Sequence, residues 1–368
     1  MVERAEQVDP GTLARWRCAS LGLATPAYDS PGAVLADLVA TQAQDLLPGR
    51  WSLAQRCAVV PTDAEVARAH DVGAFVRTHT LRPTWHFVAP GDLAMVLAAT
   101  SGRVRQLMAH MNRQVGVDAD LMTRARPVLE RRLADASATR DELAAALAES
   151  GIDAAGTRLA HVVMWAELEG WIGSGPARGN RQTYRLLPPL EPWDEADARV
   201  ELARRYVRTR GPVTVRDFAT WASLTLTQAR RAVDAVEPDR LEADGVTYVH
   251  TSAPPAPPEG PVARLLQAYD ELVMSYSDSR DVLTGGATLW DLPARTFMHP
   301  LAIDGRLVGH WRYDRDAAGR PERVTTRLLR QLSRLERDAL AAEVSRFATF
   351  AGRDVEWRAA AATEPGAV

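Results

Sequence analysis

The sequence contains no lysine, so all 44 of its basic residues are arginines. A standard P-loop and a protein-kinase site each require a lysine, and both are therefore excluded. Schiff-base catalysis on a lysine amine is excluded for the same reason. Any covalent or phosphate chemistry in this protein must use other side chains.

Cysteine and long apolar runs are also scarce. The two cysteines, Cys18 and Cys57, have no ligand-like spacing, so we expect reduced thiols in the core rather than a disulfide. No stretch approaches the ~18 consecutive apolar residues of a membrane span. Residues 1–6 lack the apolar segment of a signal peptide. We therefore expect a cytoplasmic protein without membrane contact.

Familiar catalytic motifs are absent as well. Gly-x-Ser-x-Gly, His-Glu-x-x-His and Cys-x-x-Cys do not occur, and the eight histidines are scattered without metal-ligand spacing. We expect no metal and no cofactor. The 46% hydrophobic and 25% charged residues are typical of a globular chain with two to four domains. A net charge of -3 argues against a uniformly basic nucleic-acid binder but leaves the distribution of the arginines open.

One stretch, residues 34–45, combines helical periodicity with a pair of glutamines. The apolar positions at helical spacing are Val34, Leu35, Leu38 and Val39. Pro31-Gly32 and residues 46–49 are expected to stop the helix at its two ends. This pattern predicts a helix that carries Gln42 and Gln44 near its C-terminal end, beside a loop. Such a pair is usually a solvated polar face, so a functional role depends on the rest of the chain.

Residues 75–88 are rich in β-branched and aromatic residues and turn at Arg82-Pro83, which predicts a hairpin. Helices are expected at 63–70 and 92–107. Helices followed by a two-stranded hairpin make a winged helix, which we expect over residues 10–125.

The same order of elements recurs twice. Within 126–190, helices are expected at 139–149 and 157–169, followed by a hairpin around the glycine-rich loop 173–181. Within 194–252, helices are expected at 195–209, 214–221 and 225–236, with a hairpin at 241–249. Three copies of one supersecondary unit indicate a repeat of architecture.

A proline-rich linker, residues 251–261, marks the clearest boundary, and we expect it to be an extended, semi-rigid spacer. Beyond it, residues 262–358 are expected to form a small β-barrel or sheet from strands at 296–303, 307–313 and 323–328, closed by a helix at 333–350. Arginines recur every three or four residues from Arg320 to Arg337. We expect this stripe to be split over two elements, because Pro321 and the β-favouring residues 324–326 interrupt a helix. The expected fold class is α+β and mainly helical.

Four motifs together resemble a known family. They are Val39–Asp45, Arg77–Val88, Ala268–Glu271 and Asp304–Arg312. In this order and spacing they are similar to the AlkZ/YcaQ-like winged-helix DNA glycosylases, over nearly the whole chain. The resemblance implies three tandem winged-helix domains and a C-terminal β-barrel domain, arranged as a C-shaped clamp around DNA. That layout agrees with the elements expected from the residues.

The resemblance also implies a catalytic Gln-aliphatic-Gln motif, matched here by Gln42 and Gln44 as in the azinomycin-resistance branch. The other branch has aspartate at the second position, which is Gln44 here. An amide is no general base, so the glutamines could only position a water and aim dipoles at the developing sugar cation. Such a site suits N7-alkylated purines, whose charged base departs without a general acid. Asp45 and Thr84 are expected to support the pair.

Without a lysine amine, such an enzyme would be monofunctional and leave an abasic site unnicked. The implied partner is double-stranded DNA with alkylated bases, bound by a monomer near the nucleoid. We expect DNA contacts from basic residues of the first two hairpins and of one neighbouring segment. These residues are Arg77, Arg82, His86, Arg178, Arg181 and Arg50.

Two alternatives remain open at the level of sequence. A non-catalytic winged-helix protein, such as a transcription regulator, would form a homodimer with a preferred DNA sequence, because paired half-sites require two-fold symmetry. A glycosylase would be monomeric with little sequence preference. A paralogue that folds but has lost its substrate would have the same sequence features as an active enzyme. The adduct is not specified by the sequence.

Overall fold

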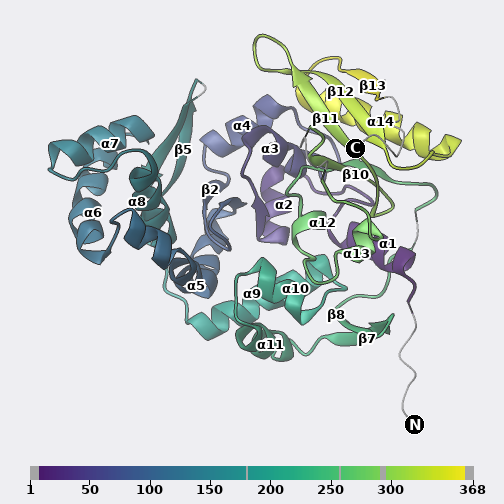
Figure 1. Cartoon of the computed structure of the whole chain (residues 1–368), viewed down its shortest axis with the longest axis horizontal. Coiled ribbons are helices and arrows are strands. Elements are labelled where there is room, and N and C mark those ends of the chain that lie inside the picture. The colour runs from purple at the N-terminus through teal and green to yellow at the C-terminus, as the bar shows by residue number, and fades with distance from the viewer. Residues whose placement is uncertain (1–7, 180, 257, 291–295, 361–368) are drawn as a thin grey trace.

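The computed structural model describes residues 8–179, 181–256, 258–290 and 296–360 (Figure 1). Asn180 of the second expected hairpin and Pro257 of the linker lie outside these ranges. In the described part of the chain, helices alternate with four sheets, whose strand orders are β1-β3-β2, β4-β6-β5, β7-β8 and β13-β12-β11-β10-β9. The architecture is thus mixed α/β with mainly helical connections, as expected.

The first region, residues 8–114, contains the glutamine pair. Its elements are α1 (Pro10–Ser20), α2 (Pro31–Leu38), β1 (Ala40–Gln42), α3 (Leu46–Ala54), α4 (Asp63–Asp71), β2 (Val76–His79), β3 (Trp85–Val88), the 3-10 turn η1 (Pro90–Asp92) and α5 (Leu93–Gln114). The expected hairpin is confirmed, and β3 pairs antiparallel with both β2 and β1.

The expected helix over 34–45 is wrong. Helix α2 ends at Leu38, because Val39 adopts a φ of 70° that no helix can continue. The next three residues form β1, in which Gln42 lies opposite His86 of β3. Residues 46–49, expected to stop a helix, instead begin α3. The glutamines therefore lie on and just after an edge strand, not on a helix.

The second region, residues 117–190, has a core of its own. Its elements are α6 (Ala119–Leu133), β4 (Ala138–Thr139), α7 (Arg140–Glu149), α8 (Gly156–Leu168), β5 (Ile172–Arg178) and β6 (Arg181–Leu186). A capping box between Thr139 and Glu142 begins α7. Helix α6 was not expected and spans the boundary expected between residues 125 and 126. Its apolar face packs into the second core, so the cores divide near Val117.

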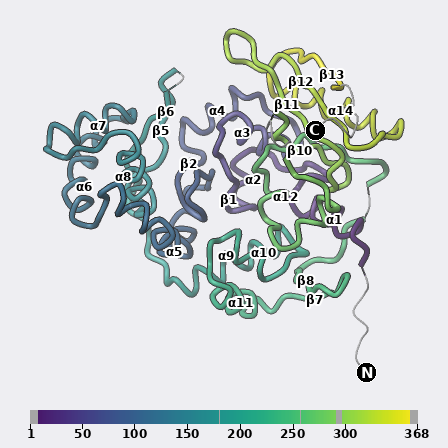
Figure 2. Tube along the Cα trace, viewed as in Figure 1, coloured from purple at the N-terminus to yellow at the C-terminus, as the bar shows by residue number. Residues whose placement is uncertain are grey.

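The third region, residues 194–250, packs against the first. Its elements are α9 (Glu195–Arg210), α10 (Val215–Trp221), α11 (Leu226–Asp234), β7 (Asp239–Ala243) and β8 (Val246–His250). Helix α9 contacts α5, α2 and α11 (Figure 2). The first, third and C-terminal regions thereby share one hydrophobic core.

The C-terminal region, residues 262–360, forms a five-stranded sheet beside α14. Its elements are β9 (Ala263–Leu265), α12 (Glu271–Met274), α13 (Asp281–Thr284), β10 (His299–Ile303), β11 (Arg306–Arg315), β12 (Pro321–Leu328), α14 (Arg334–Ala351) and β13 (Glu356–Ala359). The hairpin between β10 and β11 and the closing helix α14 are confirmed. The arginine stripe is split between β12 and α14, as expected.

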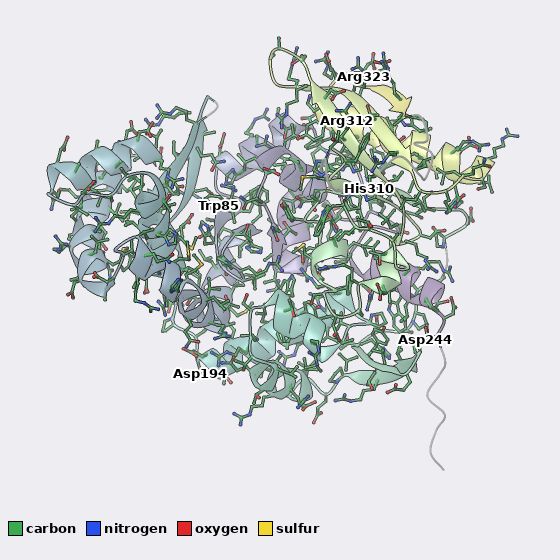
Figure 3. All side chains as sticks on the ribbon, in the orientation of Figure 1. Trp85, Asp194, Asp244, His310, Arg312 and Arg323 are labelled. Atoms are coloured by element: carbon green, nitrogen blue, oxygen red, sulfur yellow. The ribbon has the colours of Figure 1, made fainter. Side chains whose placement is uncertain are left out.

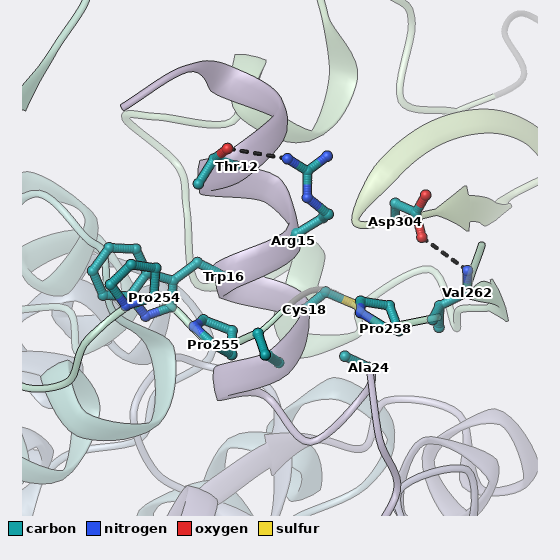
Figure 4. Close-up of a pocket in the computed structure, with 12 residues that line it drawn as sticks. Thr12, Arg15, Trp16, Cys18, Ala24, Pro254, Pro255, Pro258, Val262 and Asp304 are labelled. Atoms are coloured by element: carbon teal, nitrogen blue, oxygen red, sulfur yellow. Dashed lines mark hydrogen bonds between the residues drawn. The ribbon is translucent and has the colours of Figure 1, made fainter. Parts of the chain in front are cut away.

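The proline-rich linker packs against α1 rather than standing free. Pro254, Pro255 and Pro258 line a cavity of about 190 Å³ together with Trp16 and Cys18 of α1 (Figure 4). Burial raises the pKa of the Cys18 thiol to about 12, so this side chain is an unreactive core thiol.

Candidate functional site

The two glutamines lie in the chain at the end of β1 and between β1 and α3. Gln42 is 5% exposed, whereas Gln44 is exposed. Gln42 is the last residue of β1, and the chain bends at Gln44 and Asp45 before α3 begins. A Cβ on Gly49 of α3 would lie only 3.3 Å from the Ala43 Cα. The middle residue is therefore packed tightly onto α3, which fixes the spacing of the two amides.

The amide of Gln42 has a determined orientation. Arg82, at the turn of the first hairpin, donates from Nη2 to Gln42 Oε1 over 2.8 Å. Because a guanidinium can only donate, the bonded amide atom must be the oxygen. The same Nη2 lies 3.3 Å from Nε2 of His86, whose Nδ1 lies 3.0 Å from the carbonyl oxygen of Thr84. Burial, followed by the charge of Arg82, holds the pKa of His86 well below its usual range. The imidazole is thus neutral, with Nδ1 donating and Nε2 accepting.

Gln44 is held by its side chain and by its backbone. The Thr84 hydroxyl donates to Gln44 Oε1 over 2.6 Å. Arg77 donates from Nη2 to the Gln44 carbonyl (3.0 Å) and from Nε to the Ala43 carbonyl (2.8 Å). Its third contact runs from Nη1 to Gln182 Oε1 of β6 (2.7 Å). Arg77 therefore links the glutamine segment to the second hairpin.

Trp85 lies beside this arginine, between the first and second regions (Figure 3). The guanidinium carbon of Arg77 is 4.3 Å from the centre of the Trp85 ring, a cation–π contact. Burial lowers the pKa of Arg77 to about 10, so the side chain remains charged at neutral pH. A charged group held by three acceptors and a ring is a rigid support.

The expected DNA-contacting residues fall into two groups. His86 and Arg77 are 0% and 4% exposed, so these two side chains are too buried to contact DNA directly. Arg82 faces Gln42. Arg50 pairs with Asp63. In contrast, Arg178 and Arg181 at the second hairpin are exposed, and they pair with carboxylates at the protein surface, those of Glu142 and Asp141.

Asp45 is exposed and caps α3 only through its backbone. No hydrogen bond or ion pair of its carboxylate occurs in the described part of the chain. Asp45 is thus the residue before α3 and not, as expected, one step along a helix from Gln44.

Three residues that the sequence did not single out hold the backbone of β1. They are Gln267, Glu271 and Arg210, all fully buried. Glu271 belongs to the motif 268–271, which carried the family resemblance, so a signal for it existed. Its neighbour Asp270 forms a buried ion pair of 2.8 Å with Arg56 of the first region. The motif therefore joins the C-terminal region to the glutamine segment.

The hydrogen-bonding groups of the site are mainly amides and a hydroxyl. Within the described ranges, Nε2 of Gln42 and of Gln44 forms no hydrogen bond, so both amino groups remain available. No group of three or more His, Cys, Asp or Glu residues with metal-binding geometry occurs among the described residues. No helix in the described part is both long and apolar enough to cross a membrane. The two amides and the groups that hold them can orient a water and a sugar.

Comparisons with known proteins define the class. Residues 35–350 match the family model described as DNA glycosylase AlkZ-like. Because this match spans most of the chain, the protein is a DNA glycosylase by family. Within that class, it belongs to the AlkZ-like DNA glycosylase family.

The fold agrees with a solved structure, the DNA glycosylase AlkZ of Streptomyces sahachiroi. The two chains superpose with a TM-score of 0.75 at 20% sequence identity, over 96% of this chain and 100% of the other. At this identity the likeness concerns the fold alone. A search of curated protein sequences finds no match.

Proposed function

We propose that this protein is a monofunctional DNA glycosylase that removes N7-alkylated purines. The proposed substrate class includes bulky adducts and crosslinks. The observation that carries the proposal is the anchoring of both glutamine amides by their oxygens, through Arg82 and Thr84. Two neutral amides with anchored oxygens suit the orientation of reactants rather than proton abstraction.

In this proposal, the free amino groups of Gln42 and Gln44 donate hydrogen bonds to the attacking water or to the deoxyribose. The remaining lone pairs of their oxygens lie toward developing positive charge at the sugar. His86 stays neutral and buried, so it acts on Arg82 and not on the substrate. The site thus contributes preorganisation without a strong acid or base.

The substrate class follows from this modest chemistry. An N7-alkylated purine carries a positive charge, and breaking its glycosidic bond releases a neutral base. Such a leaving group needs no general acid, whereas an unmodified purine does. Without lysine in the sequence, the product is an intact strand with an abasic site.

We further propose that the protein grips duplex DNA as a monomeric clamp of three winged helices and the C-terminal sheet. Figure 1 supports this layout, because the second hairpin (β5–β6) and the β11–β12 hairpin rise on opposite sides of α4. Arg178 and Arg181 are exposed on the second hairpin and would reach phosphates there. Phosphate contacts of this kind weaken steeply with salt.

The test is incubation of the purified protein with a duplex that contains a single N7-methylguanine. Half of the product is treated with hot alkali, which cleaves abasic sites. We expect strand cleavage only after alkali. Cleavage without alkali would contradict monofunctional action. Persistent duplex binding without excision of methyl or bulky N7 adducts would favour a non-catalytic DNA-binding protein.

A further inference from the structure

Strand β1 is an edge strand, and side chains complete its open edge. The sheet order is β1-β3-β2, so only β3 pairs with β1. On the other side, Arg210 Nη2 donates to the Ala40 carbonyl over 3.1 Å. The backbone N–H of Gln42 donates to Glu271 Oε1 over 3.3 Å, and Gln267 Nε2 donates to the Gln42 carbonyl over 2.8 Å. Side chains of two other regions thus replace a neighbouring strand.

The far oxygen of Glu271 is fixed by three donors. Arg210 Nη2 donates over 2.9 Å, Trp221 Nε1 over 2.8 Å and the Ser275 hydroxyl over 2.9 Å. Glu271, Arg210 and Trp221 are all 0% exposed. A buried carboxylate with this many partners has one available position. Its remaining oxygen is therefore aimed at the Gln42 N–H.

Gln267 is placed by the segment that precedes it. The carbonyl of Leu265 accepts from Trp51 Nε1 of α3 over 2.7 Å, and the carbonyl of Leu266 accepts from Trp311 Nε1 of β11 over 2.8 Å. Both indoles are almost completely buried. The backbone of Gln267 is consequently fixed relative to α3, which begins just after Gln44.

We propose that Gln267 and Glu271 are positioning residues of the glycosylase site, which act on the reaction through the backbone of Gln42. This inference rests on the function proposed above. The two side chains clamp both backbone polar groups of Gln42, while Arg82 holds the amide oxygen. Together these contacts set the distance between the Gln42 and Gln44 amides. Neither Gln267 nor Glu271 touches the substrate.

The chemistry of the clamp gives a discriminating variant. In Glu271→Gln, the amide oxygen must face the donors Arg210 and Trp221, which can only donate. The new amino group then faces the Gln42 N–H, so two donors oppose each other. This change keeps the size and shape of the side chain but replaces its hydrogen bond to β1 with a repulsive contact. In Gln267→Met, the donor to the Gln42 carbonyl is removed at nearly constant volume.

Asn112 provides a control of similar burial. It lies on α5, and its Oδ1 is 2.7 Å from Nδ1 of His161 on α8, with both side chains buried. Asn112→Leu therefore removes a buried polar contact that involves neither β1 nor residues 265–271. We expect it to lower the thermal unfolding temperature without changing the rate of excision by the folded protein.

The experiment compares the parent protein with Glu271→Gln, Gln267→Met and Asn112→Leu. Single-turnover excision of N7-methylguanine, the Kd for the same duplex and the unfolding temperature are measured for each. We expect the Glu271 and Gln267 variants to lose about 10- to 100-fold in rate, since small misplacements are costly. Their Kd should stay within about twofold of the parent value.

Three results would overturn the inference. The first is excision at the parent rate by folded Glu271→Gln and Gln267→Met. The second is a loss of rate that only follows the folded fraction, with Asn112→Leu showing the same loss at equal destabilisation. The third is weaker DNA binding that accounts for the whole effect. Absence of excision by the parent protein would instead contradict the proposed function, and the inference with it.

Discussion

The first and second hairpins carry the same kind of residue in different settings. In the first, formed by β2 and β3, Arg77 and Arg82 turn inward and donate to the backbone or side chains of the glutamine segment. In the second, formed by β5 and β6, Arg178 and Arg181 are exposed and contact surface carboxylates. Each inward arginine forms several hydrogen bonds away from solvent, whereas the ion pairs of the outward arginines are screened by water.

This difference indicates a division of labour between the hairpins. An inward arginine donates its hydrogen bonds to the glutamine segment, so its contribution lies in holding the glutamines. An outward arginine can exchange a weak surface partner for a DNA phosphate at little cost. The first hairpin should therefore control the rate of excision, and the second should control affinity.

The largest effect is expected at Arg82. Arg82→Met removes a charge-assisted hydrogen bond to Gln42 Oε1 and leaves Nε2 of His86 without its donor. Such bonds contribute about 1.5–3 kcal/mol, so the single-turnover rate should fall about 10- to 100-fold. Single-turnover excision and the Kd, measured together, check this. An unchanged rate with weaker binding would place Arg82 among the DNA contacts. It would also contradict the division of labour between the two hairpins.

A smaller effect is expected at Thr84. Thr84→Val keeps the shape but removes the hydroxyl that donates to Gln44 Oε1, whereas Thr84→Ser keeps the donor. A neutral hydrogen bond contributes about 1 kcal/mol, so the valine variant should be about fivefold slower. The serine variant should remain close to the parent rate. Equal rates for the two variants would show that the hydroxyl does not position Gln44.

The outward arginines should affect binding alone. The double variant Arg178→Ala with Arg181→Ala should bind duplex DNA less tightly and with a shallower dependence on salt, by about one unit of log-log slope for each phosphate that is no longer neutralised. At saturating protein its excision rate should equal that of the parent. Arg204→Ala is the control, because Arg204 is also exposed and paired, to Glu201 on α9. Slower excision by the double variant at saturating protein would show that the second hairpin contributes to the chemical step.

The smallest effect at neutral pH concerns His70, which joins the two hairpin regions through a 2.7 Å contact of its Nε2 with Ser174 Oγ. Burial lowers the pKa of His70 from 6.5 to about 4. Between these values the unfolded chain binds a proton that the folded protein does not, so stability falls as the pH falls below 6.5. Denaturant unfolding at pH 7.5 and 5.0 measures this loss, which should shrink in His70→Gln. An equal loss in both proteins would contradict it.

Local patterns predicted the hairpins and most helices because their determinants are close in sequence. The first hairpin turns at Arg82-Pro83, and capping residues such as Thr139 and Ser333 begin their helices. Our sequence-based prediction missed α1 and α6, although Asp9 and Asp118 cap them locally. It also missed the short edge strands β9 and β13, which depend on pairing with β10 and β12. It also continued a helix through residues 39–45, because an apolar run suits either a helix or a buried strand.

The same limit applies to the site. Gln42, Gln44 and Thr84 are close together in the structure and could be proposed from motifs. The open edge of the strand that carries Gln42 is completed by Arg210, Gln267 and Glu271, which lie about 170 to 230 positions away in the sequence. No local propensity specifies such contacts. The motif 268–271 indicated importance without indicating what it touches.

The most direct test of the account is the effect of Gln44→Ala on single-turnover excision of N7-methylguanine, measured alongside the Kd for the same duplex. Gln44 is exposed, and its removal leaves the contacts of Arg77 with the backbone in place. The account predicts that excision is largely lost while the affinity stays within about twofold. Excision by Gln44→Ala at the parent rate would contradict the central role of the glutamine pair.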